Sequence, residues 1–139
     1  MSEENKALAR RFYEEVWNGQ NLDAIDELVA ADVVIHSAPP GLPEGAAGVK
    51  ALIGMYLSAF PDMKMTVEDI IATGDRVVTR WAATGTHQGV LMGVPPTGKH
   101  VTATGIGIDR VSGGRVVETW GEFDALGVMQ QLGVVPTPE

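Results

Sequence analysis

The chain has 139 residues, 45% hydrophobic and 20% charged, a balance typical of one globular domain with a sizeable core and not of a disordered chain. Its 10 lysine and arginine residues against 18 aspartate and glutamate residues give a formal net charge of -8. Such a surface repels nucleic-acid phosphates and anionic lipids, so we expect neither nucleic acid nor a membrane as partner. The absence of cysteine excludes disulfides, thiolate nucleophiles and sulfur-ligated metal sites.

The amino-terminal stretch MSEENKALARR begins with acidic residues and has no apolar segment of the kind found in signal peptides. No apolar run approaches the roughly 20 residues that a membrane-spanning helix needs. We therefore expect a cytoplasmic protein with a single domain over residues 1–139.

Hydrophobic periodicity divides the chain into a helical first part and a β-rich second part. Apolar residues recur about every four positions up to Phe60 and every second position from Lys64 onward. Asn21 is expected to cap the second helix and Asp124 the last one, because their side chains can accept free N–H groups of a first helical turn. The expected elements, in chain order, are helices over residues 3–18 and 22–29, a short strand over 33–37, a helix over 49–60, strands over 64–73, 76–87, 100–111 and 115–123, and a helix over 125–132.

The order of these elements predicts an α+β architecture. Four consecutive strands joined by short turns form an antiparallel meander, and the helices must cover one of its faces. We expect a cone-shaped single domain in which a curved antiparallel sheet wraps over the N-terminal helices. Such curvature leaves an internal pocket between sheet and helices, a usual place for a small ligand.

Three stretches of the sequence point to a known family. They are TGTHQGVLMGVPPTGKHVTATGI, a following strand that contains Gly-Gly-Arg-Val, and ETWGEFDALGVMQQLG. Together with the opening FYEEVWNGQNLDAIDELVAADVV, they resemble the SnoaL-like polyketide (ester) cyclases over nearly the whole chain. The pairing of GTHxGxxxGxPPTG with DxxGxxxQLG is fairly specific for this family. The resemblance implies the conical α+β fold of ketosteroid isomerase and nuclear transport factor two.

The resemblance also implies a mechanism, but its two catalytic positions are altered. In the characterised cyclases of this family, an aspartate on the last strand and a histidine on the preceding strand support an intramolecular aldol condensation without cofactor or metal. The resemblance places the aspartate at Gly121 and the histidine at Gly107. This sequence therefore cannot use the family's mechanism with those two groups.

The glycines at these positions have two interpretations. Alternation along a strand puts Gly105 and Gly107 on one face of their strand, and Gly121 and Phe123 on one face of the next. If these faces line the cone, the missing side chains widen the pocket. Alternatively, the glycines help the sheet to bend. Both interpretations stay open at this point.

The segment GRVVETWGEFDALG places three acidic side chains close to a tryptophan. Glu118, Trp120 and Glu122 alternate with Gly121, so we expect them on the outer face of the sheet, toward solvent or a subunit partner. A strand bulge could turn Glu122 into the pocket, where it could take part in catalysis. Asp109 shares a strand face with Gly107 but lies toward the strand's far end, where a solvent-exposed position is at least equally expected.

His36, His87 and Asp62 are further candidates for a catalytic base. Each histidine ends a strand next to a proline- and glycine-rich segment, and imidazole titrates near neutral pH. The alternative is a packed or hydrogen-bonded structural role, which is the commoner one for a single histidine. Asp62 would have a raised pKa beneath an apolar pocket, but it could equally satisfy backbone N–H groups between helix and strand.

Aromatic residues at core spacing and residues on the glycine-bearing strand faces could form the pocket wall. Aromatic residues at such spacing more often serve packing, although aromatic walls suit a flat polycyclic ligand. Three histidines far apart in sequence lack the spacing of a metal site, so neither a metal nor a cofactor is expected. The expected pocket residues are Tyr13, Trp17, Tyr56, Trp81, Gly105, Gly107, Gly121 and Phe123.

Two functions from different classes follow from these observations. The first is a cofactor-independent SnoaL-like enzyme of the cyclase or isomerase type, which acts by acid/base chemistry on a hydrophobic, polyketide-like carbonyl compound. The second is a non-catalytic protein that holds a small hydrophobic molecule in a widened apolar cone, and the glycines at 107 and 121 favour it. The resemblance also implies a homodimer or larger homo-oligomer, and apolar outer-face residues such as Val78 and Trp120 agree with that.

Overall fold

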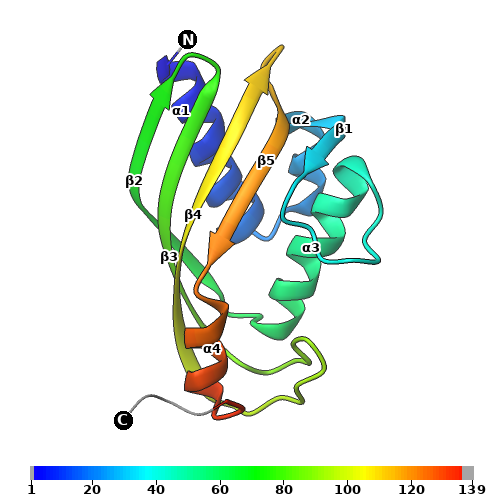
Figure 1. Ribbon diagram of the computed structural model, residues 1–139, viewed down its shortest axis with the longest axis vertical. Coiled ribbons are helices and arrows are strands. Elements are labelled where there is room, and N and C mark those ends of the chain that lie inside the picture. Colours follow the sequence, from blue (N-terminus) through cyan, green and yellow to red (C-terminus); the bar gives the residue numbers. More distant parts are fainter. Residues whose placement is uncertain (1, 136–139) are drawn as a thin grey trace.

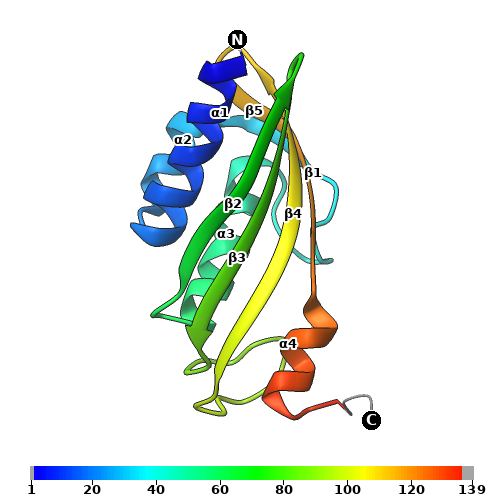
Figure 2. The ribbon, with the colours of Figure 1, turned by 90° about the vertical axis from the view of Figure 1, so that its left-hand side faces the viewer.

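The computed structural model describes residues 2–135 and has an α+β architecture. A curved five-stranded sheet forms one side of the molecule, and the helices of the first half cover its concave face (Figures 1 and 2). The elements are α1 (Ser2–Arg11), a π-helical segment (Phe12–Asn18), a short 3-10 helix (Leu22–Ala24), α2 (Ile25–Leu28), β1 (Val29–Ile35), α3 (Gly45–Ala59), β2 (Lys64–Thr73), β3 (Arg76–Thr86), β4 (His100–Ser112), β5 (Arg115–Phe123) and α4 (Ala125–Leu132).

The sheet has the strand order β1-β5-β4-β3-β2. Strands β2 to β5 form the antiparallel meander that the sequence predicts. The expectation of a wholly antiparallel sheet is wrong at one edge, because β1 pairs parallel to β5. A parallel neighbour needs a long crossover connection, and here the chain between β1 and β5 contains α3 and the other three strands.

Irregular pairing accompanies the curvature of the sheet. The register shifts between Val67 and Asp69 in β2 and between Arg110 and Val111 in β4. Such bulges bend a strand and increase its twist. As a result, the sheet curls around the helices, and Figure 2 shows the long strands β3 and β4 bowed along the whole molecule.

The helices of the first half depart from the predicted boundaries. The second helix ends at Leu28, and the side chain of Asn21 makes no capping hydrogen bond. Val29 instead begins β1, four residues before the predicted strand start. Helix α3 begins at Gly45 and not at residue 49. Gly45 has a φ of +71°, and a Cβ there would lie 2.2 Å from the carbonyl oxygen of Ala31, so a glycine lets α3 start in contact with β1.

The hydrophobic core lies in separate clusters on either side of the cone interior. One cluster joins α2, β1 and α3 around Ile25, Leu28 and Ile53. Another joins the end of α3 to α4 around Phe60 and Val128. Asp124 caps α4 as predicted, because its carboxylate accepts the backbone N–H of Gly127 at 2.8 Å. No helix in the described part of the chain is long and apolar enough to span a membrane.

Candidate active site

A cavity of about 500 Å³ lies between the concave face of the sheet and the helices. Its wall is formed by the π-helical segment and α3 on one side and by β3, β4 and β5 on the other. Ser37 and Glu122, both exposed, belong to the residues that border it. Most of the wall is hydrocarbon, as is usual for sites that bind small apolar molecules.

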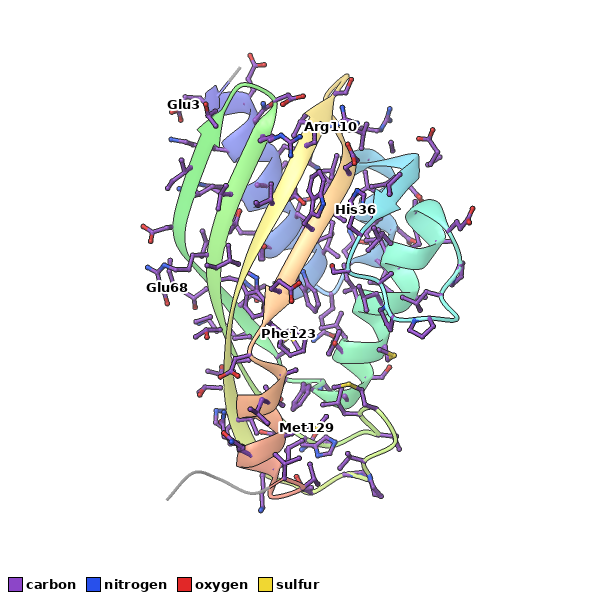
Figure 3. The ribbon with its side chains drawn as sticks, viewed as in Figure 1. Glu3, His36, Glu68, Arg110, Phe123 and Met129 are labelled. Carbon is purple, nitrogen blue, oxygen red and sulfur yellow. The ribbon has the colours of Figure 1, made fainter. Side chains whose placement is uncertain are left out.

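Four aromatic side chains follow one another along the cavity wall. The ring centroids of Trp17 and Tyr56 lie 6.5 Å apart, those of Tyr56 and Phe123 5.8 Å apart, and those of Phe123 and Trp81 6.4 Å apart. All four rings border the cavity. Figure 3 shows Phe123 at the end of β5, between the sheet and α3. The sequence proposed these four residues for the pocket because of their core spacing.

The three glycines of the inner sheet face have different surroundings. A Cβ on Gly105 would lie 2.3 Å from the ring of Trp81, whereas on Gly107 and Gly121 the nearest atoms would be 3.5 Å and 3.7 Å away. None of the three has a positive φ. A glycine is therefore needed at position 105 to leave room for the ring of Trp81. Gly105 does not border the cavity, so its expected place among the pocket residues is wrong.

Gly107 and Gly121 instead leave open space in the cavity wall. They are register partners across β4 and β5 and both border the cavity. Ordinary contact distances around a Cβ mean that neither backbone position requires glycine. Of the two interpretations left open by the sequence, pocket widening fits Gly107 and Gly121, and close packing fits Gly105.

A polar group lies next to this open space. Asp109 lies two residues after Gly107 on β4, on the same strand face, and it borders the cavity. Its register partner on β5 is Thr119. Burial raises the pKa of the Asp109 carboxyl to about 6, while the hydroxyl of Thr119 offsets part of that rise. The residue as a whole is half-buried, and it borders the cavity. The expectation that Asp109 is equally well solvent-exposed is wrong, because the sheet and the first helix enclose it.

Tyr13 brings a phenol to the same region. Its hydroxyl lies 3.7 Å from the point where a Cβ on Gly107 would stand. Burial and the negative charge of Asp109 both raise the pKa of Tyr13, and the nearby Thr79 hydroxyl lowers it in part. Thr79 is 1% exposed, and among the described residues its hydroxyl oxygen has no hydrogen-bond partner within ordinary distance and angle. A carboxylate and a protonated phenol therefore face the same part of the cavity.

The raised pKa of Asp109 predicts an effect on stability. Because its native pKa of about 6 exceeds the ordinary 3.8, the folded protein binds more protons than the unfolded chain between these values. Stability therefore falls as pH rises through this window and stays lower above it. We expect Asp109→Asn to raise the free energy of unfolding by about 1–3 kcal/mol at pH 7.5. Urea unfolding checks this, and the gain must shrink as pH falls toward 4; a loss of stability at both pH values contradicts it.

The structure places His36 on the outer side of the sheet edge and not among the residues that border the cavity. Its Nε2 lies 2.8 Å from Oε2 of Glu118, and its ring stacks on Trp120 with a centroid distance of 4.6 Å. Arg110 donates to the other oxygen of Glu118. Hydrogen bonds from His36 and Arg110 lower the pKa of Glu118. Figure 3 shows His36 and Arg110 in the same half of the molecule, away from Phe123.

His87 and Asp62 are also held by contacts away from the cavity. His87 is fully buried, its Nδ1 accepts the backbone N–H of Thr97 at 3.2 Å, and its Nε2 has no partner among the described residues. Asp62 accepts the backbone N–H and the hydroxyl of Thr86, both at 2.7 Å. These bonds lower the pKa of Asp62. Of the four catalytic candidates from the sequence, only Glu122 is among the residues that border the cavity. Its register partner is Ile106 of the outer face, and the strand pairing is regular at this position. Without the bulge that could have turned it inward, the side chain of Glu122 points to the outer face of the sheet.

The residue that the sequence interpretation missed is Asp109. The available signal was its shared strand face with Gly107, which correctly placed it on the inner side. Its electrostatic neighbour Tyr13 is nearly a hundred positions earlier in the chain. Within the described residues, no three histidine, aspartate or glutamate side chains gather closely enough to hold a metal ion.

Comparison with known proteins identifies the family and supports the fold. The model of the SnoaL-like polyketide cyclase family matches residues 7–132. No curated protein matches the sequence. IdmH from Streptomyces antibioticus, proposed to be a polyketide cyclase, is 40% identical with a TM-score of 0.80, over 94% of this chain and 99% of that one. AclR from Streptomyces galilaeus, proposed to be a hydroxylase, is 34% identical with a TM-score of 0.86, over 99% and 89%.

A third structure extends the likeness of the fold. TsrD from Streptomyces laurentii is 25% identical, with a TM-score of 0.88 over 96% of this chain and 97% of that one. The family model covers most of the chain, and the similar structures share its α+β cone. The chain belongs to the SnoaL-like polyketide cyclase family.

Proposed function

We propose that this protein is a cofactor-independent enzyme of the cyclase or isomerase type, in which Asp109 acts as the general base on a hydrophobic, polyketide-like carbonyl compound. The single observation that carries the proposal is the buried carboxyl of Asp109 in an otherwise apolar cavity, with a pKa of about 6. A base with a pKa near the working pH is both ionised and strong enough to accept a proton from carbon. Family membership supports the reaction class.

The chemistry assigned to the site is proton transfer next to a carbonyl. The carboxylate of Asp109 removes a proton from the carbon beside the carbonyl group, and the negative charge moves to the carbonyl oxygen. The phenol of Tyr13, which its raised pKa keeps protonated, donates a hydrogen bond to that oxygen. Asp109 then returns the proton to carbon at another position. Alternatively, the enolate carbon forms a bond to a second carbonyl carbon of the same molecule, and Asp109 gives the proton to the alkoxide oxygen that results, which completes the ring closure.

The other candidates from the sequence take different roles in this proposal. His36, His87 and Asp62 hold neighbouring elements together through the contacts described above. Glu122 is exposed and shares the outer face of the sheet with Ile106, so its carboxylate takes no part in the proton transfer. The alternative of a non-catalytic binding protein is less well supported, because two titratable side chains reach one part of the cavity.

The test of this function is the exchange of carbon-bound hydrogen. A hydrophobic 1,3-diketone or aryl ketone is incubated with the protein in deuterated buffer, and its mass is followed with time. We expect the protein to accelerate deuterium uptake next to the carbonyl above the buffer rate. If several such ketones bind in the cavity and the protein accelerates deuterium uptake by none of them, the non-catalytic binding protein is favoured.

We also propose that the protein forms a homodimer through the outer face of the sheet. Ile106 is 50% exposed on that face, and Val78, Ile108 and Trp120 lie half-buried beside it. An uncovered apolar sheet face of this kind is typical of a subunit interface. The cytoplasmic location expected from the sequence stays a prediction.

Substitution on this face tests the dimer. We expect Ile106→Glu to convert the dimer to a monomer in size-exclusion chromatography with light scattering, because it places a charge in an apolar interface. Val90→Glu is the matched control, since Val90 is 61% exposed on a loop away from the sheet face. A monomeric wild-type protein, or a dimer that survives Ile106→Glu, contradicts the proposed interface.

A further inference from the structure

The charges around the cavity are of one sign. Among the described residues that border it, Asp109 and Glu122 are acidic, the latter with its side chain on the outer face, and no lysine, arginine or histidine is present. The neighbouring cations are held on the outside: Arg110 pairs with Glu118, and Arg80 pairs with Asp69. An anionic ligand would therefore meet negative charge with no compensating group.

In the described part of the chain, no lysine, arginine or histidine pairs with the carboxylate of Asp109 in this enclosed space. Its polar contact is with the Thr119 hydroxyl, which offsets desolvation only in part. A buried charge is stabilised by an opposite charge far more than by a neutral group. A ligand that brings a cation to Asp109 therefore gains an interaction that a neutral or anionic ligand cannot make.

The aromatic wall offers a ligand a second kind of contact in the same cavity. Trp17, Tyr56, Phe123 and Trp81 contact one another in that order, and each borders the cavity. The same rings give the hydrocarbon part of a ligand a large apolar surface.

We propose that the cavity binds hydrophobic amines in their protonated form, with the ammonium group paired to Asp109 and the hydrocarbon part against the aromatic wall. This goes beyond the proposed reaction and rests on it only in placing Asp109 in contact with the ligand. An amine bound in this way also occupies the base and blocks proton transfer from a ketone.

Three probes that share one ring system test the proposal. They are 1-naphthylmethylamine, 1-naphthylmethanol and 1-naphthoate, titrated into the full chain at pH 7.5 by calorimetry. We expect the amine to bind at least about tenfold more tightly than the alcohol, and the carboxylate to bind at least about tenfold more weakly. The alcohol controls for shape and apolar contact.

Variants separate the contact from the overall negative charge of the protein. Asp109→Asn is expected to remove the advantage of the amine while leaving the alcohol's affinity within about twofold. Glu68→Gln is the matched control, since it removes one negative charge from the exposed face of β2, away from the cavity (Figure 3). The control should keep the order of the three probes.

The outcomes also distinguish this proposal from the proposed reaction. Equal binding of amine and alcohol, no measurable binding of the amine, or an amine advantage that survives Asp109→Asn each overturns the proposal. If any of these results is obtained while wild-type protein still accelerates deuterium exchange, the proposed reaction is supported and the proposed amine site is wrong. If amines bind through Asp109 but the protein accelerates deuterium uptake by no ketone, the amine site is supported and the proposed reaction is wrong.

Discussion

Replacing Asp109 with asparagine should lower the protein's acceleration of carbon-bound hydrogen exchange by about 10²–10⁴-fold, because general base catalysis typically contributes this much. Asparagine keeps the size of the side chain and cannot accept the proton. The fold should survive, since the substitution removes an unpaired buried charge. The measurement is the rate of deuterium uptake by a hydrophobic ketone, with circular dichroism as the check on folding.

Two further variants accompany this experiment, one as a test of the second group and one as a control. Tyr13→Phe should lower the same rate by about 10–10³-fold, because the enolate oxygen loses one hydrogen-bond donor. Asp62→Asn should leave the rate per folded molecule unchanged, since Asp62 contacts Thr86 and not the cavity. A rate that survives in Asp109→Asn but is lost in Glu122→Gln would move the base to the mouth of the cavity.

The second large effect is expected at the glycines of the inner sheet face. Gly105→Ala should destabilise the protein by about 1–3 kcal/mol, because its Cβ would overlap the Trp81 ring and force repacking. Gly107→Ala and Gly121→Ala should stay within about 0.5 kcal/mol of wild type, since their Cβ atoms meet only ordinary contacts. Urea unfolding at a pH where all variants fold measures the three differences.

The same glycines should differ in their effect on ligands. Gly121→Leu fills the open space beside Asp109 and is expected to weaken binding of a polycyclic ligand by about tenfold or more, without a comparable loss for a single-ring ligand. Equal destabilisation by all three alanine substitutions, or no effect of Gly121→Leu on large ligands, would mean that the glycines serve the bending of the sheet.

The sequence predicts the four-strand meander and the last helix with boundaries close to those observed, because alternation and turn residues are local signals. The strand pairing at the sheet edge was not predictable in the same way. The parallel contact of β1 with β5 joins Val29 to Val116, and no local pattern records such a distant partner. The early start of α3 depends likewise on a close approach between Gly45 and Ala31.

In the candidate site, too, the features set by local sequence were predictable and those set by distant contacts were not. Spacing and alternation were enough to propose the aromatic wall and the inner position of Gly107 and Gly121. The burial of Asp109 was not predictable in this way, because a carboxylate near a turn is usually solvated, and local sequence does not record distant neighbours such as Tyr13. The histidines were proposed for their chemistry alone, and their surroundings depend on tertiary contacts such as that of His36 with Glu118.

The central claim is that the cone holds an enclosed carboxylate able to act as a base near neutral pH. The most direct measurement is the pKa of Asp109 in the ligand-free protein, followed by carboxyl ¹³C NMR and assigned by comparison with Asp109→Asn. The account predicts a pKa of about 6, well above the values of the exposed aspartates. A pKa near the ordinary 3.8 would show a solvated carboxylate and contradict both the proposed reaction and its base.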